Sequence, residues 1–224
     1  MKKLSIKDII EFRRKSDKSK KTFAANMQME KEKTSSDGGG DYWISSISAI
    51  SKSFKLNDKK FIDERREELE QKYDKTDFQR TKTMYKRNID ILYIFEDFDF
   101  AKLKPEKFNF LKKNKKDSIL LIKGLDFKVT PSHLFTYSSE EIDEIGAIWF
   151  VAKLDGFREE ELGMFADILY RYLKIHYSKD YTISPKYCIA VDVVNKFSIT
   201  YQQLEIGEID NIFLRTVDEL KKLM

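Results

Sequence analysis

The sequence is poor in the residues that build disulfide frameworks and zinc sites. Its 224 residues include one cysteine and two histidines. A single cysteine cannot form an intramolecular disulfide, and this cysteine usage is typical of a reducing compartment. One cysteine and two histidines also exclude a His/Cys zinc site with the usual four ligands. The glycines form neither a G-x-G-x-x-G nor a G-K-[ST] motif, so we expect no nucleotide cofactor.

Long hydrophobic runs are absent as well. No apolar stretch approaches the roughly 20 residues that cross a bilayer. The first residues, MKKLSIKDIIEFRRKS, lack an apolar core and a small-residue cleavage site, so no secretory signal is indicated. We therefore expect a cytoplasmic protein with no membrane association.

The residues that are present predict a globular chain with an uneven charge. Hydrophobic residues make up 41% and aromatic residues 13%, which is enough for a core. Residues 1–117 hold 30 Lys+Arg and 21 Asp+Glu, a net charge of +9, whereas residues 118–224 hold 12 and 17, a net charge of −5. This asymmetry indicates a polyanion-binding front, two halves that attract each other, or simply a lysine-rich composition.

The first half of the chain has helical periodicity. Ser5 and Asp8 have the spacing of a capping box at the start of the first helix. Residues 16–40 are polar and end in TSSDGGG, which predicts a flexible basic arm with room for a short docked segment at Phe23, Ala24 and Met27. The expected helices are residues 6–15, 41–54, 57–73 and 78–98.

From residue 118 the pattern changes to strands. IGAIWFVAKL is almost continuously apolar, which is typical of a central strand that is covered on both faces. The expected strands are residues 118–124, 125–130, 133–137, 145–154, 187–194 and 195–203, with helices over residues 158–176 and 204–223. We therefore predict an α/β fold, with α+β as the alternative, in which a helical N-terminal part precedes a mixed central sheet. The expected parts are residues 1–40, the helix and arm, residues 41–117, the helical part, and residues 118–224, the sheet part that packs with it.

The order of elements between residues 119 and 194 resembles the core of the PD-(D/E)xK, or restriction-endonuclease-like, superfamily. IKGLDFKVTPSHLFTY matches its first two strands, IGAIWFVAKL the third, residues 158–176 the crossover helix and YCIAVDVV the last strand. In that superfamily the second strand begins with Pro-Asp and the third carries Asp/Glu-x-Lys. The two carboxylates hold a divalent metal ion, and the lysine positions the attacking water.

The sequence departs from that motif at the positions that matter. Ser132 follows Pro131 where aspartate is expected, and Ala147 and Trp149 stand near the positions of the acid and the lysine. The resemblance therefore implies a relative that has lost metal-dependent hydrolysis and needs no cofactor. The alternative is a nuclease with a rearranged Mg²⁺ site, for which the candidate residues are Asp126, His133, Glu144, Lys153 and Asp155.

The whole chain also resembles a group of bacterial proteins of about this length. The features that match are FRRKS, GGGDYWISSISAISKSF, the I-x-G-L and VDV strands and the strand at residues 146–148. This resemblance indicates membership of the group and says nothing about the activity of its members.

Two basic stretches are candidates for contacts with nucleic acid. Phe108 and Phe110 precede the second stretch and are suited either to stacking on bases or to anchoring the loop. The candidate residues are Arg13, Arg14, Lys15, Lys112, Lys113, Lys115 and Lys116. We therefore expect a non-catalytic relative of the nuclease fold that binds nucleic acid or serves a defence or mobile-element assembly. The further alternative is a protein–protein interaction module, with a protein partner or as a homodimer.

Overall fold

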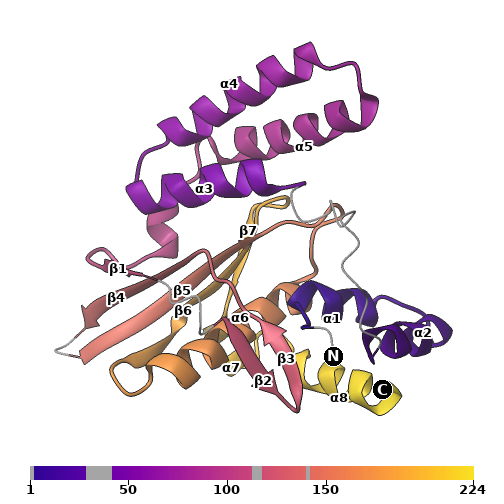
Figure 1. Ribbon diagram of the computed structural model, residues 1–224. Helices are drawn as coiled ribbons and strands as arrows, with labels where there is room; N and C mark the ends of the chain where they lie inside the picture. The colour runs from indigo at the N-terminus through magenta and orange to yellow at the C-terminus, as the bar shows by residue number, and fades with distance from the viewer. Residues whose placement is uncertain (1–2, 29–41, 113–117, 140–141) are drawn as a thin grey trace.

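The computed structural model describes residues 3–28, 42–112, 118–139 and 142–224 (Figure 1). The helices are α1 (Ile6–Arg13), α2 (Asp17–Gln28), α3 (Ile44–Leu56), α4 (Lys60–Lys75), α5 (Gln79–Phe95), α6 (Glu159–Tyr177), α7 (Tyr201–Glu205) and α8 (Phe213–Leu223), with a 3-10 helix η1 (Phe100–Leu103). The strands are β1 (Asn109–Leu111), β2 (Ile119–Ile122), β3 (Leu125–Lys128), β4 (His133–Ser139), β5 (Ile142–Val151), β6 (Thr182–Asp192) and β7 (Phe197–Thr200). None of the helices in these described ranges is long and apolar enough to cross a membrane.

Five of the strands form one mixed sheet in the order β1-β4-β5-β6-β7. Strands β5 and β6 are parallel and are joined by the crossover helix α6, whereas the other neighbouring pairs are antiparallel. Helices α3, α4 and α5 lie over one face of the sheet, and α6 and α8 lie on the other side (Figure 1). The predicted α/β class with a helical front and a mixed central sheet is therefore confirmed.

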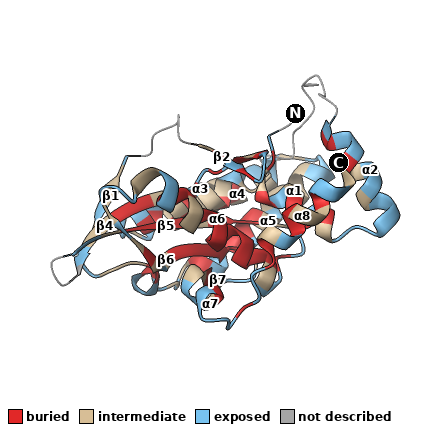
Figure 2. Ribbon diagram, turned by 90° about the horizontal axis from the view of Figure 1, so that it is seen from below, coloured by how far each residue is buried: buried red, intermediate tan, exposed pale blue. Residues whose placement is uncertain are grey.

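Both faces of β5 are buried, as its apolar run predicts. Ile145 and Ala147 point to the side of α6, while Ile148 and Phe150 point to the side of α3. Figure 2 shows buried residues concentrated in β5, β6 and α6. The alternation of a pleated strand supplies apolar contacts to both helical layers, so β5 holds the two cores together.

The hairpin β2–β3 differs from its predicted place as part of the central sheet. It forms a separate two-stranded sheet, closed by Lys123 and Gly124, whose φ angles are 52° and 81°. Two successive residues with positive φ make the tight turn that pairs a strand with its own continuation. The edge position next to β4 is taken instead by the short strand β1, which lies in the part of the chain expected to be helical.

The described part of the predicted flexible arm, residues 16–28, is mostly helical and contains the expected docked segment, while residues 29–40 lie outside the described residues. Helix α2 begins at Asp17, and its Ala24 and Met27 are buried in the same core as Phe12 of α1. The predicted capping box is confirmed, because Ser5 Oγ accepts a hydrogen bond from Asp8 N at 3.2 Å and Ser5 N donates to Asp8 Oδ2 at 2.7 Å. The start of the second predicted helix, Asp41, lies outside the described residues.

The end of the chain also differs from one continuous helix over residues 204–223. It is divided into α7 and α8, and Gly207 between them has a φ of +76°. That left-handed conformation is compatible with glycine and ends a helix. Strand β6 begins at Thr182 rather than at residue 187, so Pro185 lies within a strand that starts five residues earlier than predicted.

Gly146 provides a test of how closely β5 and β6 pack. It lies where the register between these strands shifts, and a Cβ atom there would lie 2.7 Å from Tyr187 Cβ and 2.8 Å from the Tyr187 carbonyl oxygen. We expect Gly146→Ala to lower the free energy of unfolding by about 1–3 kcal/mol, measured by urea denaturation. Thr182→Ala, an exposed change on β6, should alter it by less than about 0.5 kcal/mol, and equal effects of the two changes would contradict this packing.

Candidate functional site

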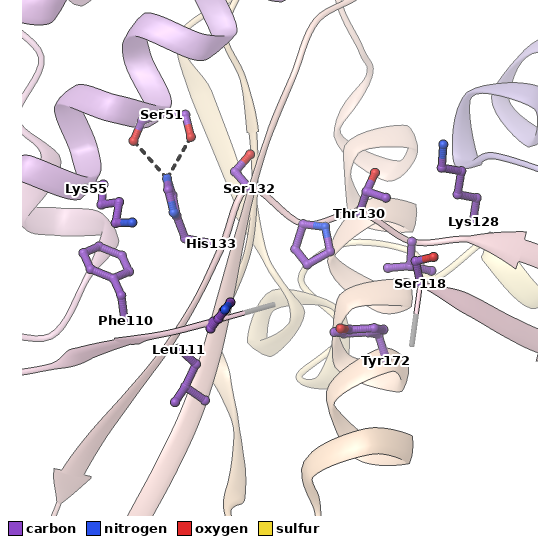
Figure 3. A pocket seen from close by; sticks show the side chains of 13 residues that line it. Ser51, Lys55, Phe110, Leu111, Ser118, Lys128, Thr130, Ser132, His133 and Tyr172 are labelled. Atoms are coloured by element: carbon purple, nitrogen blue, oxygen red, sulfur yellow. Dashed lines mark hydrogen bonds between the residues drawn. The ribbon is translucent and has the colours of Figure 1, made fainter. Parts of the chain in front are cut away.

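A pocket of about 800 Å³ lies at the edge of the sheet where β4 begins, and we call it the edge pocket (Figure 3). It is bounded by α3, by the end of β1, by the segment that joins β3 to β4, and by α6. Its lining residues are Ser51, Lys55, Phe110, Leu111, Lys112, Ser118, Lys128, Val129, Thr130, Pro131, Ser132, His133 and Tyr172. Residues that are far apart in the sequence therefore meet at this site.

All the charged side chains among the described residues that line the edge pocket are positive. Lys55, Lys112 and Lys128 line it, and no aspartate or glutamate occurs among the described residues around it. All three lysines are exposed, and none forms an ion pair with a carboxylate of the described chain. Three cations with no counter-charge among the described residues create a positive potential that attracts anions.

A fourth cation lies beside this group. Lys104 shares a neighbouring pocket with Lys55, and its Nζ donates to Asn57 Oδ1 at 3.1 Å. The Lys104 Nζ also lies 5.3 Å and 5.5 Å from the ring centres of Phe54 and Phe108. Burial lowers the pKa of Lys104. Glu106 also lines this neighbouring pocket, so the positive charge there is partly balanced and the region without a described carboxylate is the edge pocket itself.

His133 anchors helix α3 to the start of β4. Its Nε2 lies 2.7 Å from Ser51 Oγ and 2.9 Å from the Ser51 carbonyl oxygen, and its ring stacks on Phe54 with the centres 5.6 Å apart. In the tautomer that carries its hydrogen on Nε2, the ring donates to the Ser51 carbonyl oxygen and so to α3. In that tautomer Nε2 has no lone pair directed at the serine hydroxyl, so His133 would anchor the helix and would not act as a general base toward Ser51.

Ser132 stands where the resemblance to the nuclease superfamily places the first metal-binding aspartate. Ser132 N donates to the Ile148 carbonyl at 2.8 Å, and Phe150 N donates to Ser132 Oγ at 3.0 Å. The serine thus completes the pairing of β4 with β5. Across residues 3–28, 42–112, 118–139 and 142–224, no three or more His, Cys, Asp or Glu side chains are grouped so that they could hold a metal ion.

The acidic candidates predicted from the sequence are distributed over several places. Asp126 lies on β3, and Glu144 near the start of β5 accepts a hydrogen bond from the Tyr137 hydroxyl at 2.7 Å. Lys153 and Asp155 follow the other end of β5. The strand between Glu144 and Val151 alone spans about 23 Å, so the structure does not bring Glu144 together with Lys153 and Asp155.

Asp155 lines a second pocket, of about 720 Å³, between α1 and the start of α6. Its other lining residues are Arg13, Arg14, Lys20, Phe157, Arg158 and Glu161. The cations here are partly neutralised, because Lys20 Nζ pairs with Glu219 at 2.6 Å and Arg14 pairs with Glu161. This pocket is therefore less suited to an anion than the edge pocket.

Arg14 is held by a partner within the chain. Its Nε donates to Glu161 Oε1 at 2.6 Å, its Nη2 donates to Glu161 Oε2, and Nη2 also donates to the Gly156 carbonyl at 3.2 Å. Burial alone raises the pKa of Glu161, whereas the hydrogen bonds from Arg14 and from Arg158 N lower it. The lowering effects together are larger, so the pKa of Glu161 lies below the usual value. Arg14, a candidate nucleic-acid contact in the sequence, therefore joins α1 to α6.

The other basic candidates have different surroundings. Lys112 lines the edge pocket, while Lys15 is exposed and its Nζ lies 5.6 Å from the ring centre of Phe23. Lys113, Lys115 and Lys116 lie outside the described residues. Lys55 and Lys128 are not predicted from the sequence, because neither belongs to a run of basic residues.

Cys188 is completely buried on β6, and burial raises the pKa of its thiol. A thiol that stays protonated is not a nucleophile, and this position fits the small core residue expected from its apolar strand.

Comparisons of this chain with protein-family models, with curated proteins and with solved structures find no match.

Proposed function

We propose that this protein binds nucleic acid at the edge pocket, where Lys55, Lys112 and Lys128 contact phosphate groups. The observation that carries the proposal is the lining of the edge pocket. It combines apolar walls with three lysines that form no ion pair with the described residues, and no carboxylate occurs among its described lining residues. Lysine contacts to phosphates supply affinity that is independent of base sequence. Lys55 and Lys112 belong to the basic half of the chain, and Lys128 belongs to the other half.

The proposed protein binds its ligand without cleaving it. Ser132, Ala147 and Trp149 stand where the nuclease resemblance would place the metal-binding acids and the lysine, and none of them carries a carboxylate or an ammonium group. The alternative is a nuclease with a rearranged metal site drawn from Asp126, His133, Glu144, Lys153 and Asp155. Its support is weaker, because Glu144 lies near the start of β5 whereas Lys153 and Asp155 follow its end. A binding role in a defence or mobile-element assembly remains part of this proposal.

The salt dependence of binding tests the proposal. We expect the full chain to bind a labelled single-stranded oligonucleotide at low salt, with an association constant that falls as the salt concentration rises. Three phosphate contacts predict a slope of log K against log salt of about −2, because each contact to a single strand contributes about −0.7. Fluorescence anisotropy over a KCl series measures this slope.

A peptide nucleic acid with the same bases but no phosphates is the matched control, and we expect it to bind far more weakly. If neither single-stranded nor double-stranded oligonucleotides bind at low salt, the proposed function is wrong.

A further inference from the structure

The edge pocket is a concavity rather than a flat positive surface, and this shape restricts the form of nucleic acid that fills it. From this, and resting on the function proposed above, we infer that the pocket receives an unstacked base. The ligand class would then be a single-stranded segment or a single-stranded end. A continuous duplex can present its phosphates to surface lysines, but its bases are stacked and paired and cannot enter a pocket without being extruded.

The size of the edge pocket suits one nucleotide unit. Its volume of about 800 Å³ falls within the range of roughly 300–1,000 Å³ that is usual for pockets that enclose small organic ligands. A site that recognised only the phosphate backbone would need lysines on an open surface and no enclosed space.

The interior of the edge pocket is apolar and partly aromatic. Phe110 on β1 and Tyr172 on α6 lie on opposite sides of it in the close view (Figure 3). The Phe110 ring is fixed by neighbours, with ring centres 5.2 Å from His133 and 6.0 Å from Phe54. Because every base has an aromatic face, a fixed aromatic wall stacks on bases without regard to sequence.

The charged groups around this interior are complementary to the phosphates of a nucleic-acid strand. Lys55, Lys112 and Lys128 come from α3, from the residue after β1 and from β3, and their side chains are exposed. Apolar walls with exposed amines around them match a nucleotide whose base is buried and whose flanking phosphates remain outside. The arrangement therefore combines the stacking surface and the cationic groove of single-strand binding sites.

Oligonucleotides that differ only in the base test this inference on the unaltered protein. We expect a single-stranded oligonucleotide to bind at least tenfold more tightly than a blunt duplex of the same length in fluorescence anisotropy. An oligonucleotide of the same length with consecutive abasic sites keeps its phosphates and loses its bases. Its affinity should be roughly 5- to 150-fold lower, the range that corresponds to losing one base–aromatic stack.

A variant pair supports the same test from the side of the protein. Phe110→Leu should weaken single-strand binding and leave duplex binding unchanged, whereas Phe78→Ala, which removes an aromatic residue that is 79% exposed and does not line the pocket, should change neither. A thermal melt of each variant confirms that it is folded, and the abasic comparison needs no variant.

The outcomes separate the two proposals. If duplex and abasic oligonucleotides bind as tightly as the intact single strand, the inference of an unstacked base is overturned and the function proposed above stands. If no oligonucleotide binds at low salt, the function itself is overturned and the inference falls with it.

Discussion

Replacing Lys55, Lys112 and Lys128 together by alanine should lower the affinity for a single-stranded oligonucleotide about a hundredfold at low salt. These residues are the lysines of the edge pocket, and no described carboxylate lines the pocket beside them. Each lysine–phosphate contact contributes on the order of 1 kcal/mol net, so the loss of three contacts corresponds to a factor of about 10². The slope of log K against log salt should become shallower by about 2, which a KCl series of anisotropy titrations measures.

A second triple variant separates the site from the total charge. Lys75→Ala, Lys174→Ala and Lys186→Ala remove the same charge from exposed positions on α4, α6 and β6 that do not line the edge pocket. We expect this variant to bind within about twofold of the unaltered protein. If both triple variants lose affinity equally, binding follows the net charge of the chain, and the assignment to the edge pocket is wrong.

The sequence locates only part of this site because topology brings the rest together. Lys112 belongs to a visible basic run, and Phe110 precedes it, so both are predicted candidates. Lys55 shares its helix only with Lys52, and Lys128 is the one lysine of β3, so neither belongs to a basic run that would mark a site. Their approach to Lys112 depends on the pairing of β1 with β4 and on the hairpin β2–β3, which are properties of the whole fold.

The same distinction applies to the secondary structure. The apolar run of β5 identifies a central strand because burial on both faces leaves a strong pattern. Strand β1 has three residues and is fixed by its partner β4, so periodicity alone does not reveal it. Helix α2 is mostly polar, so the sequence indicates only a short docked segment at Phe23, Ala24 and Met27, while the packing of the whole helix beside α8 is a property of the fold.

The charge asymmetry has two consequences in the structure. Some positive residues of the first half pair with acids of the second half, as Arg14 does with Glu161 and Lys20 with Glu219. These pairs support the expectation that the two halves attract each other. The lysines of the edge pocket have no such partners among the described residues, which leaves them available for an external anion.

Arg14→Met should lower the free energy of unfolding at pH 7 by about 3 kcal/mol. Glu161 is only 1% exposed, and its carboxylate keeps one hydrogen bond, from Arg158 N at 3.0 Å, after the guanidinium is removed. A buried charge that loses its partner costs roughly 3–5 kcal/mol, and the partial exposure of Arg14 places the effect at the lower end. Urea denaturation followed by far-UV circular dichroism measures this loss.

The effect of Arg14→Met should depend on pH with a defined sign. In the unaltered protein the pKa of Glu161 is lowered, so its contribution to stability is full above about pH 4.3, the usual value for glutamate, and is lost as the pH falls through the folded-state pKa. Without Arg14, burial dominates and raises this pKa, so the variant gains a proton more readily. The stability difference between the two proteins should therefore shrink as the pH falls from 6 to 3.

Two further variants show whether the pairing itself is responsible. Glu161→Gln removes the titrating group and should abolish this part of the pH dependence. Arg14→Met combined with Glu161→Met replaces both charges by apolar side chains and should recover most of the lost stability, because no unpaired charge stays buried. If Arg14→Met alone is as stable as the unaltered protein at pH 7, the ion pair does not hold α1 against α6. Arg14 would then be free to act as the nucleic-acid contact that its sequence context suggests.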